Sequence, residues 1–365
     1  MRRTYRGLGA ALVALLTVPA GLTAEAEDES WEGYRADPAV SLCEVEPMLA
    51  PPRCPWYFRT DAVMLRRDVH GATDAATLDG PDILVLSTRD LDMPFRAGPK
   101  FLIGHTLGDS PYQVEASYLW LGDWDDSAAV RNTTDNGLGG QGNLFSPFTD
   151  FGNPPAEGLD YNNFVTIREF SYMDTLEINL RRLLPMPPDR LTTSFIFGFR
   201  YMGIREQFDY YSESEVPVPL GATNAVSTRT NNEMYGVQIG GLFEFYCEHQ
   251  WWVNFEIKGA LCNNAARQQT LYTIGDLGGP LDDFLGSRTK NSTAFIGDLA
   301  LTFVCRPTNR LTARVGYQAM WIEGVALAAE NFRPDVNLLT LGPAQLTSRG
   351  SVVYHGPHAG LELVW

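Results

Sequence analysis

Charged residues alternate with apolar residues along many segments of this chain. Arg200 lies between Phe199 and Tyr201, and Glu256 and Lys258 alternate with apolar neighbours in the same way. Because successive side chains of a β-strand point to opposite faces, these charges would gather on one face of a sheet. On an enclosed face they could select passing ions, or they could form salt bridges that fill the space. The charged residues assigned to this inner face are Arg59, Asp61, Glu115, Glu177, Arg200, Glu206, Glu244, Glu256, Lys258, Asp298, Arg314 and Glu362.

Sequence patterns typical of catalysis are missing. The sequence contains neither a G-x-S-x-G nor an H-E-x-x-H motif. His355 and His358 would point to opposite faces of one strand, so they are not expected to share a metal ion. Asp123, Asp125 and Asp126 offer oxygen ligands for Ca²⁺, although we favour a solvated acidic loop. We therefore expect no catalytic residue, no cofactor, no metal site and no enzymatic activity.

The five cysteines fall into two groups. Cys43 and Cys54 lie close together in a Pro-rich stretch, and an exported protein could keep a disulfide between them. Cys247, Cys262 and Cys305 occur in strand-like segments, where we interpret them as small apolar fillers. The Cys43–Cys54 disulfide is therefore a hypothesis about the N-terminal segment alone.

The N-terminus has the pattern of a secretory signal peptide. Arg2, Arg3 and Arg6 precede an apolar run over 7–20, and Ala24-Glu25-Ala26 provides a small-residue cleavage site. The pattern predicts a signal peptide over 1–26, followed by a Pro-rich periplasmic segment over 27–55. The remainder, 56–365, is predicted to be the folded domain.

Composition narrows the class of protein further. The chain has 365 residues, a formal net charge of −16 and 44% hydrophobic residues. The acidic balance argues against nucleic-acid binding, and the apolar fraction is too high for a disordered chain. No internal run of ~18 apolar residues is available for a transmembrane helix. A soluble β protein and a membrane β-barrel remain, because barrel strands alternate and contain no continuous apolar run.

Ten segments show strand periodicity, and the connections between them alternate between long and short. Outer-membrane barrels have short turns on the inner side and long loops outside, whereas a soluble sandwich has no reason to sort its loops. The predicted fold is therefore all-β, an antiparallel up-and-down transmembrane β-barrel of about ten strands. The predicted strands are 56–67, 100–107, 112–122, 164–183, 191–211, 230–248, 251–272, 290–306, 309–323 and 351–365.

The last strand also has features of an outer-membrane barrel. Ala359, Leu361 and Leu363 alternate up to Trp365, a terminal aromatic of the kind that barrel-assembly machinery reads. We expect outer-membrane lipid, this machinery, and small solutes or cations as partners, without nucleic acid. Two functions remain open. One is a narrow passive channel, porin-like and with an acidic surface. The other is a structural or surface-interaction (adhesin-like) barrel with a closed, salt-bridged lumen.

Several short motifs, in a fixed order, resemble those of a known family. Phe197–Tyr201 resembles its G-x-R-Y strand, Arg229–Gly240 its T-x-N-x-F-Y-G-x-Q-x-G stretch and Gly356–Glu362 its G-x-x-x-G-L-E end. Lys258–Asn263 and Leu311–Val325 are similar to two segments between them. The family is that of planctomycete-type outer-membrane barrels named putative beta-barrel porin-7. The resemblance implies a β-barrel in the outer membrane of a Gram-negative-type cell, and it supplies no catalytic residues.

Overall fold

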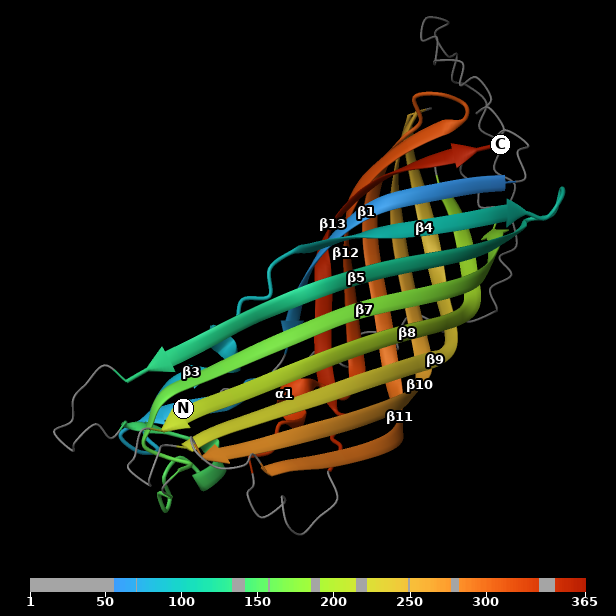
Figure 1. Cartoon of the computed structure of the whole chain (residues 1–365). Coiled ribbons are helices and arrows are strands. Elements are labelled where there is room, and N and C mark those ends of the chain that lie inside the picture. The colour runs from blue at the N-terminus through green and yellow to red at the C-terminus, as the bar shows by residue number, and fades with distance from the viewer. Residues whose placement is uncertain are drawn as a thin grey trace, which may run out of the picture. The chain divides into compact units, whose positions relative to one another are not determined.

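In the part of the chain that the structure describes, ten antiparallel strands form a closed ring, as the sequence predicts (Figure 1). The computed structural model describes residues 56–69, 71–132, 142–156, 158–184, 191–214, 222–248, 250–276, 282–334 and 345–365, which all belong to one compact unit, Met48–Trp365. Each strand pairs with its neighbours along the ring, and the pairing of the first with the last closes it. The ring strands are β1(Trp56–Val69), β4(Arg96–Thr106), β5(Tyr112–Arg131), β7(Asn162–Leu184), β8(Leu191–Ser214), β9(Ala222–Glu248), β10(Trp251–Asp276), β11(Asp282–Cys305), β12(Leu311–Val325) and β13(Gly350–Val364).

An apolar belt covers the outer face of the ring, at the end where β1 begins and β13 finishes. On β1 it runs from Trp56 to Met64, which matches the 9–11 tilted residues that a strand needs to cross a bilayer. These side chains are exposed because strand alternation turns them away from the interior. The apolar belt consists of Trp56, Phe58, Met64, Phe101, Ile103, Val114, Tyr118, Leu176, Ile178, Phe197, Phe199, Tyr235, Val237, Ile239, Phe255, Leu261, Leu301, Phe303, Val315, Tyr317, Leu361 and Leu363.

Six strands continue well beyond the apolar belt. β7 to β11 are 23 to 27 residues long, whereas β1, β4, β12 and β13 have 11 to 15. The surplus forms a sheet that we call the outer extension (Figure 1). It comprises residues 122–131, 162–174, 203–214, 222–233, 263–276 and 282–293.

The outer extension corrects five strand ends expected from the sequence. Segments 212–229 and 273–289 were predicted as long loops, but β8 ends at Ser214, β9 begins at Ala222, β10 ends at Asp276 and β11 begins at Asp282. Likewise β5 continues past 122 to Arg131. Beyond the apolar belt the outward residues are mostly polar, so hydrophobic alternation fades although backbone pairing continues.

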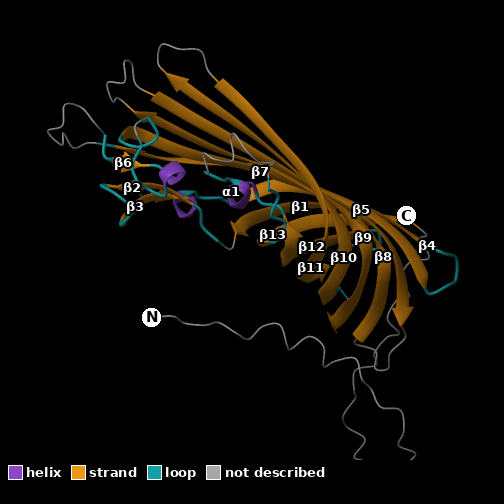
Figure 2. Ribbon diagram, turned by 90° about the horizontal axis from the view of Figure 1, so that it is seen from below, coloured by secondary structure: helices purple, strands orange, loops and turns teal. Residues whose placement is uncertain are grey.

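Short elements from three connections pack on the outer extension. They are β2(Asp74–Leu78), β3(Ile83–Ser87), η1(Thr88–Asp90), β6(Leu144–Phe145), η2(Pro147–Thr149) and α1(Ala328–Asn331). Figure 2 shows β2, β3, β6 and α1 together on one side of the extended strands. A cluster of buried side chains joins them to the sheet, including Leu86, Leu144, Ile167, Phe208 and Phe332. No helix in the described part of the chain is long and apolar enough to span a membrane.

Candidate functional site

The barrel interior contains a layer of thirteen charged side chains, which we call the charged layer. Alternation on the ring strands turns each of them inward, opposite the apolar belt. Eleven of the twelve sequence-predicted residues lie here, and the structure adds Lys100 and Arg181. Six members are basic and seven are acidic, so the formal net charge is −1. The charged layer consists of Arg59, Asp61, Lys100, Glu115, Glu177, Arg181, Arg200, Glu244, Glu256, Lys258, Asp298, Arg314 and Glu362.

Glu177 on β7 is the centre of the largest ion-pair cluster in the charged layer. Its carboxylate lies 2.8 Å from Lys258 Nζ and 3.7 Å from the Arg200 guanidinium. Lys258 also contacts Glu256 at 3.0 Å, and Arg200 forms an ion pair with Asp298 on β11. The side chains of Glu177, Lys258 and Arg200 are 5%, 7% and 1% exposed. Charges this deeply buried are stable only when paired, so each member constrains the others.

A second group of ion pairs lies in the lumen near the start of β1. Arg181 joins Glu244 at 3.1 Å to Glu115 at 3.6 Å. Tyr57 donates a hydrogen bond of 2.6 Å to Glu115. Arg59 binds Glu362 through both Nε and a terminal nitrogen, at 3.0 and 2.6 Å. The interior charges are thus satisfied mainly by one another.

Glycines on the inner face leave the space that these large side chains occupy. A Cβ at Gly104 would collide with the Tyr57 ring, and one at Gly240 would collide with Lys258. Close approach of a neighbouring side chain is a recognised role of glycine inside strands. Gly104 and Gly240 therefore contribute directly to packing around the charged layer.

The sequence prediction missed Lys100, Arg181 and His358. All three point inward and line the larger cavity of the lumen. The same two-residue period would have found Arg181, which lies four residues after Glu177 on β7. Lys100 was overlooked because the predicted strand began there, whereas β4 begins at Arg96.

Only small cavities interrupt the packing of the charged layer in the described lumen. One of about 60 Å³ is lined by Arg59, Lys100, Glu256 and Lys258, among others. A second, of about 30 Å³, lies beside Arg200 and Asp298. Because a water molecule needs ~10–15 Å³ of such volume, the two cavities could hold a few waters. Neither could hold a hydrated organic solute.

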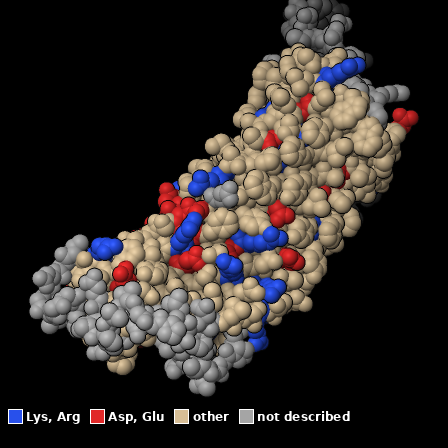
Figure 3. Space-filling view, in the orientation of Figure 1, with Lys and Arg blue, Asp and Glu red and all other residues tan. Residues whose placement is uncertain are grey.

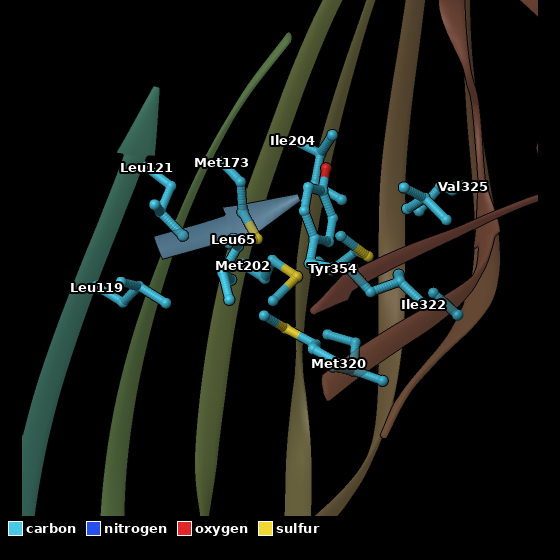
Figure 4. Packing of buried hydrophobic residues seen from close by; sticks show 14 of the residues in the cluster. Leu65, Leu119, Leu121, Met173, Met202, Ile204, Met320, Ile322, Val325 and Tyr354 are labelled. Atoms are coloured by element: carbon cyan, nitrogen blue, oxygen red, sulfur yellow. The ribbon is translucent and has the colours of Figure 1, made fainter. Parts of the chain in front are cut away.

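Directly beyond the charged layer, apolar side chains fill the lumen. This apolar layer is formed by inward residues such as Leu65, Met173, Met202, Met320 and Ile322, which point toward one another from different strands (Figure 4). They are 0–3% exposed. The layers follow one another along each strand, so that β8 presents Arg200, then Met202 and Ile204, to the interior. The sequence did not reveal this layer, because apolar residues on both faces obscure the alternation.

A third, smaller polar group lies beyond the apolar layer, and it contains Glu206. Arg67 contacts Glu206 at 2.5 Å and Glu169 at 2.9 Å, with both acids on neighbouring strands. Glu206 also accepts a hydrogen bond of 2.9 Å from the backbone N–H of Ala328, at the start of α1. Glu206 therefore links the segment between β12 and β13, which contains α1, to the barrel wall. Burial, together with the charge of Glu206, raises the pKa of Glu330 on α1.

The remaining polar residues considered in the sequence lie away from the lumen or outside the described chain. Asp125 forms an exposed ion pair with Arg168 on the outer extension, and this hydrogen bond lowers the pKa of the Asp125 carboxyl. His355 faces outward and contacts Asp68 at 2.8 Å. Among the described residues, no three His, Cys, Asp or Glu side chains are grouped as metal ligands. The segments 1–26 and 27–55, with Cys43 and Cys54, lie outside the described residues.

The architecture defines the class of protein. A closed antiparallel barrel with an apolar outer belt and a polar interior has the organisation of an outer-membrane β-barrel. The chain belongs to the family described as "Putative beta barrel porin-7 (BBP7)", which matches residues 63–356. This match confirms the resemblance seen in the sequence motifs. A planctomycete origin stays a prediction.

Several solved structures align with most of this chain, at low sequence identity and with TM-scores below 0.5. The outer membrane protease OmpT from Escherichia coli is 11% identical, with 86% of this chain and 97% of that chain covered and a TM-score of 0.46. The P. putida toluene transporter TodX is 8% identical, covering 87% and 91%, with a TM-score of 0.33. The translocator domain of the autotransporter NalP from Neisseria meningitidis is 8% identical, covering 84% and 88%, with a TM-score of 0.31. No curated protein sequence matches the chain.

Proposed function

We propose that this chain is inserted in the cell outer membrane, with the apolar belt in the bilayer. Three features support this location: the width of the belt, the buried charges behind it and membership of a porin family. Residues 1–26 would direct export as a signal peptide. The strand that ends at Trp365 would engage the assembly machinery, and its backbone already pairs with Trp56 across the closing seam. The outer extension would then project outside the cell.

We further propose that the barrel is closed in its resting state and acts through the outer extension, as a structural or surface-interaction protein. The observation that carries this proposal is the filling of the lumen by two successive layers. The charged layer leaves cavities of about 60 and 30 Å³, and the apolar layer beyond it is 0–3% exposed at its central residues. A solute crossing the barrel would have to displace both layers.

Conductance of the purified full chain in planar bilayers tests the closed state. We expect no stepwise conductance from the native sequence. Trimming the apolar layer with Met202→Ser, Met320→Ser and Ile322→Ser together should produce it. A matched control, Leu285→Ser, changes an exposed apolar residue of β11 and should remain silent. Regular conductance steps from the native sequence would rule out the closed barrel, whether or not the triple variant folds.

A narrow channel for small solutes is the second candidate, and family membership favours it. In this case the apolar layer would open, and the charged layer would select among solutes. With six basic and seven acidic members, the charged layer would give only a weak preference for cations. The ratio of K⁺ to Cl⁻ permeability, measured as a reversal potential, would then lie near one. Catalysis plays no part in either proposal.

A further inference from the structure

Three arginines form a cluster on the outer wall, just beyond the apolar belt. Arg205, Arg229 and Arg267 lie on the adjacent strands β8, β9 and β10 and are exposed. Arg205 and Arg267 both stand opposite Asn231, so one strand separates them, and their backbones are ~10 Å apart. Arg229 lies two residues along β9 from Asn231. We call these three residues the arginine patch. Figure 3 shows basic and acidic side chains interspersed over this part of the wall, below a largely uncharged surface.

The arginine patch has neutral partners only, within the described residues. Arg205 bonds to Asn231 Oδ1 at 3.3 Å and to the Tyr172 hydroxyl, and Arg229 bonds to Gln207 Oε1 at 2.9 Å. Arg267 makes neither a hydrogen bond nor an ion pair with the described chain. Several guanidinium N–H groups therefore point outward without a protein acceptor.

Two acids beside the arginine patch are occupied by amide side chains. Gln207 donates to both oxygens of Asp209, at 2.9 and 2.8 Å, and Asn231 donates to Glu233 at 3.2 Å. The same two amides accept from Arg229 and Arg205. Each amide thus lies between an arginine and an acid. Among the described residues, no carboxylate forms an ion pair with the three guanidinium groups.

Two other outward arginines, Arg66 and Arg168, differ because they have acidic partners. Arg168 forms a two-point ion pair with Asp125, at 2.7 and 2.5 Å. Arg66 contacts Asp68 at 3.1 Å and Asp92 at 3.8 Å. These arginines already have anionic partners in the protein, whereas the arginine patch has donors available for an external anion.

We propose that the arginine patch binds the phosphate of a lipid headgroup in the outer leaflet. The proposal rests on the membrane location proposed above. Arg205 is four residues beyond Tyr201, ~13 Å along a tilted strand, and its long side chain can bring the guanidinium to headgroup level. Guanidinium groups bind phosphate oxygens through paired N–H donors, and three of them suit a phosphomonoester with nearly two charges. Tyr172 and Tyr235 flank the patch as interfacial aromatics.

A lipid is favoured over a free anion because the arginine patch is an open wall and not a cavity. A dissolved phosphate would be held only by exposed charges, which salt screens. A lipid whose tails pack against the apolar belt presents its phosphate to the patch at high effective concentration. The apolar belt and the arginine patch together therefore define a lipid site.

The test uses detergent-purified full chain mixed with phosphatidic acid and phosphatidylcholine, with the retained lipids counted by native mass spectrometry. We expect the native sequence to retain phosphatidic acid with about a tenfold preference. The variant R205Q/R229Q/R267Q should lose this preference. The control R66Q/R131Q/R168Q removes three exposed arginines from the same wall and should retain it. Loss in both variants, or in neither, would overturn the proposal, as would equal competition by inorganic phosphate.

Flotation with phosphatidylcholine vesicles separates this proposal from the membrane location. Native chain that fails to float contradicts the proposed location. Chain that floats but shows no preference for phosphatidic acid contradicts the arginine patch alone. If R205Q/R229Q/R267Q fails to float, the three single variants are compared, and each should lower the preference. The variant R205K/R229K/R267K keeps the charge but loses the paired donors, so an intermediate preference is expected.

Discussion

Individual buried charges in the lumen depend on their partners more than on solvent. Glu177 illustrates this, because it contacts Lys258 at 2.8 Å and Arg200 at 3.7 Å while only 5% exposed. It also accepts from the side-chain amide of Gln238 at 3.0 Å. Removing one carboxylate would leave two buried cations with fewer acids. The resulting loss of stability should be larger than the loss caused by breaking an exposed ion pair of the outer wall.

We predict that Glu177→Ala lowers the free energy of unfolding by about 3–5 kcal/mol. The control Asp125→Ala removes an acid of an exposed pair with Arg168 and should cost about 1 kcal/mol or less. Denaturant titration of the chain refolded into vesicles provides both values. Similar losses in the two variants would contradict the view that the Glu177 cluster is shielded from water.

The inner-face glycines allow a second comparison at this scale. A Cβ at Gly104 would collide with the Tyr57 ring, whereas a Cβ at Gly259, on the outer face, would meet Phe295 at an ordinary 3.6 Å. Gly104→Ala should therefore destabilise the barrel by about 1–3 kcal/mol through overpacking. Gly259→Ala should be close to neutral. The unfolding free energies of the two variants, measured side by side, test this prediction. Equal values would contradict the view that Gly104 is needed to make room for the Tyr57 ring.

At the scale of elements, one strand has two different environments along its length. β8 carries exposed Phe197 and Phe199 in the apolar belt and exposed Arg205 beyond it, while its inward residues change from Arg200 to Met202 and Ile204. The outer face thus becomes polar where the inner face becomes apolar. The change is expected for a sheet that leaves the bilayer, because lipid no longer solvates its outer side and an apolar core must form inside.

We predict that the outer extension can loosen without opening the barrel. Phe332 is 4% exposed and packs on Phe208 and Tyr210, with ring centroids 5.2 and 5.5 Å apart. Phe332→Ala should remove about 3–5 kcal/mol of local packing. Limited proteolysis should then cut near 326–334, while the ring strands stay protected. Leu285→Ala, at an exposed site, serves as the control, and an identical digestion pattern in both would refute the prediction.

At the scale of the whole molecule, the apolar belt covers the outside of the ring. Inside the ring, the charged layer is followed along the strands by the apolar layer. This order explains how a chain with a net charge of −16 can cross a bilayer. Most charges that the described ring strands turn inward are paired in the lumen, and others lie on the outer extension. Few remain to face lipid, where a basic residue costs about 2–4 kcal/mol at the midplane.

We predict that the position of a new charge along β9 decides its effect. Ile239 is 56% exposed in the apolar belt, so Ile239→Arg should reduce insertion into vesicles by about 2–4 kcal/mol. Ala225→Arg adds the same charge on the same face, but within the outer extension, and should leave insertion unchanged. Folding yields across a range of denaturant concentrations give both numbers. Equal sensitivity at the two positions would place the bilayer elsewhere.

The sequence by itself determined the class of fold and most of the charged layer. Strand alternation is a local property, so ten strands and eleven of the thirteen charged-layer residues could be recognised without any contact information. The apolar layer, the outer extension and the separation of Glu206 from the other charges were decided only in the tertiary structure. These features depend on which residues of different strands contact one another across the lumen. Strand register, barrel closure and the solvent on each face determine those contacts.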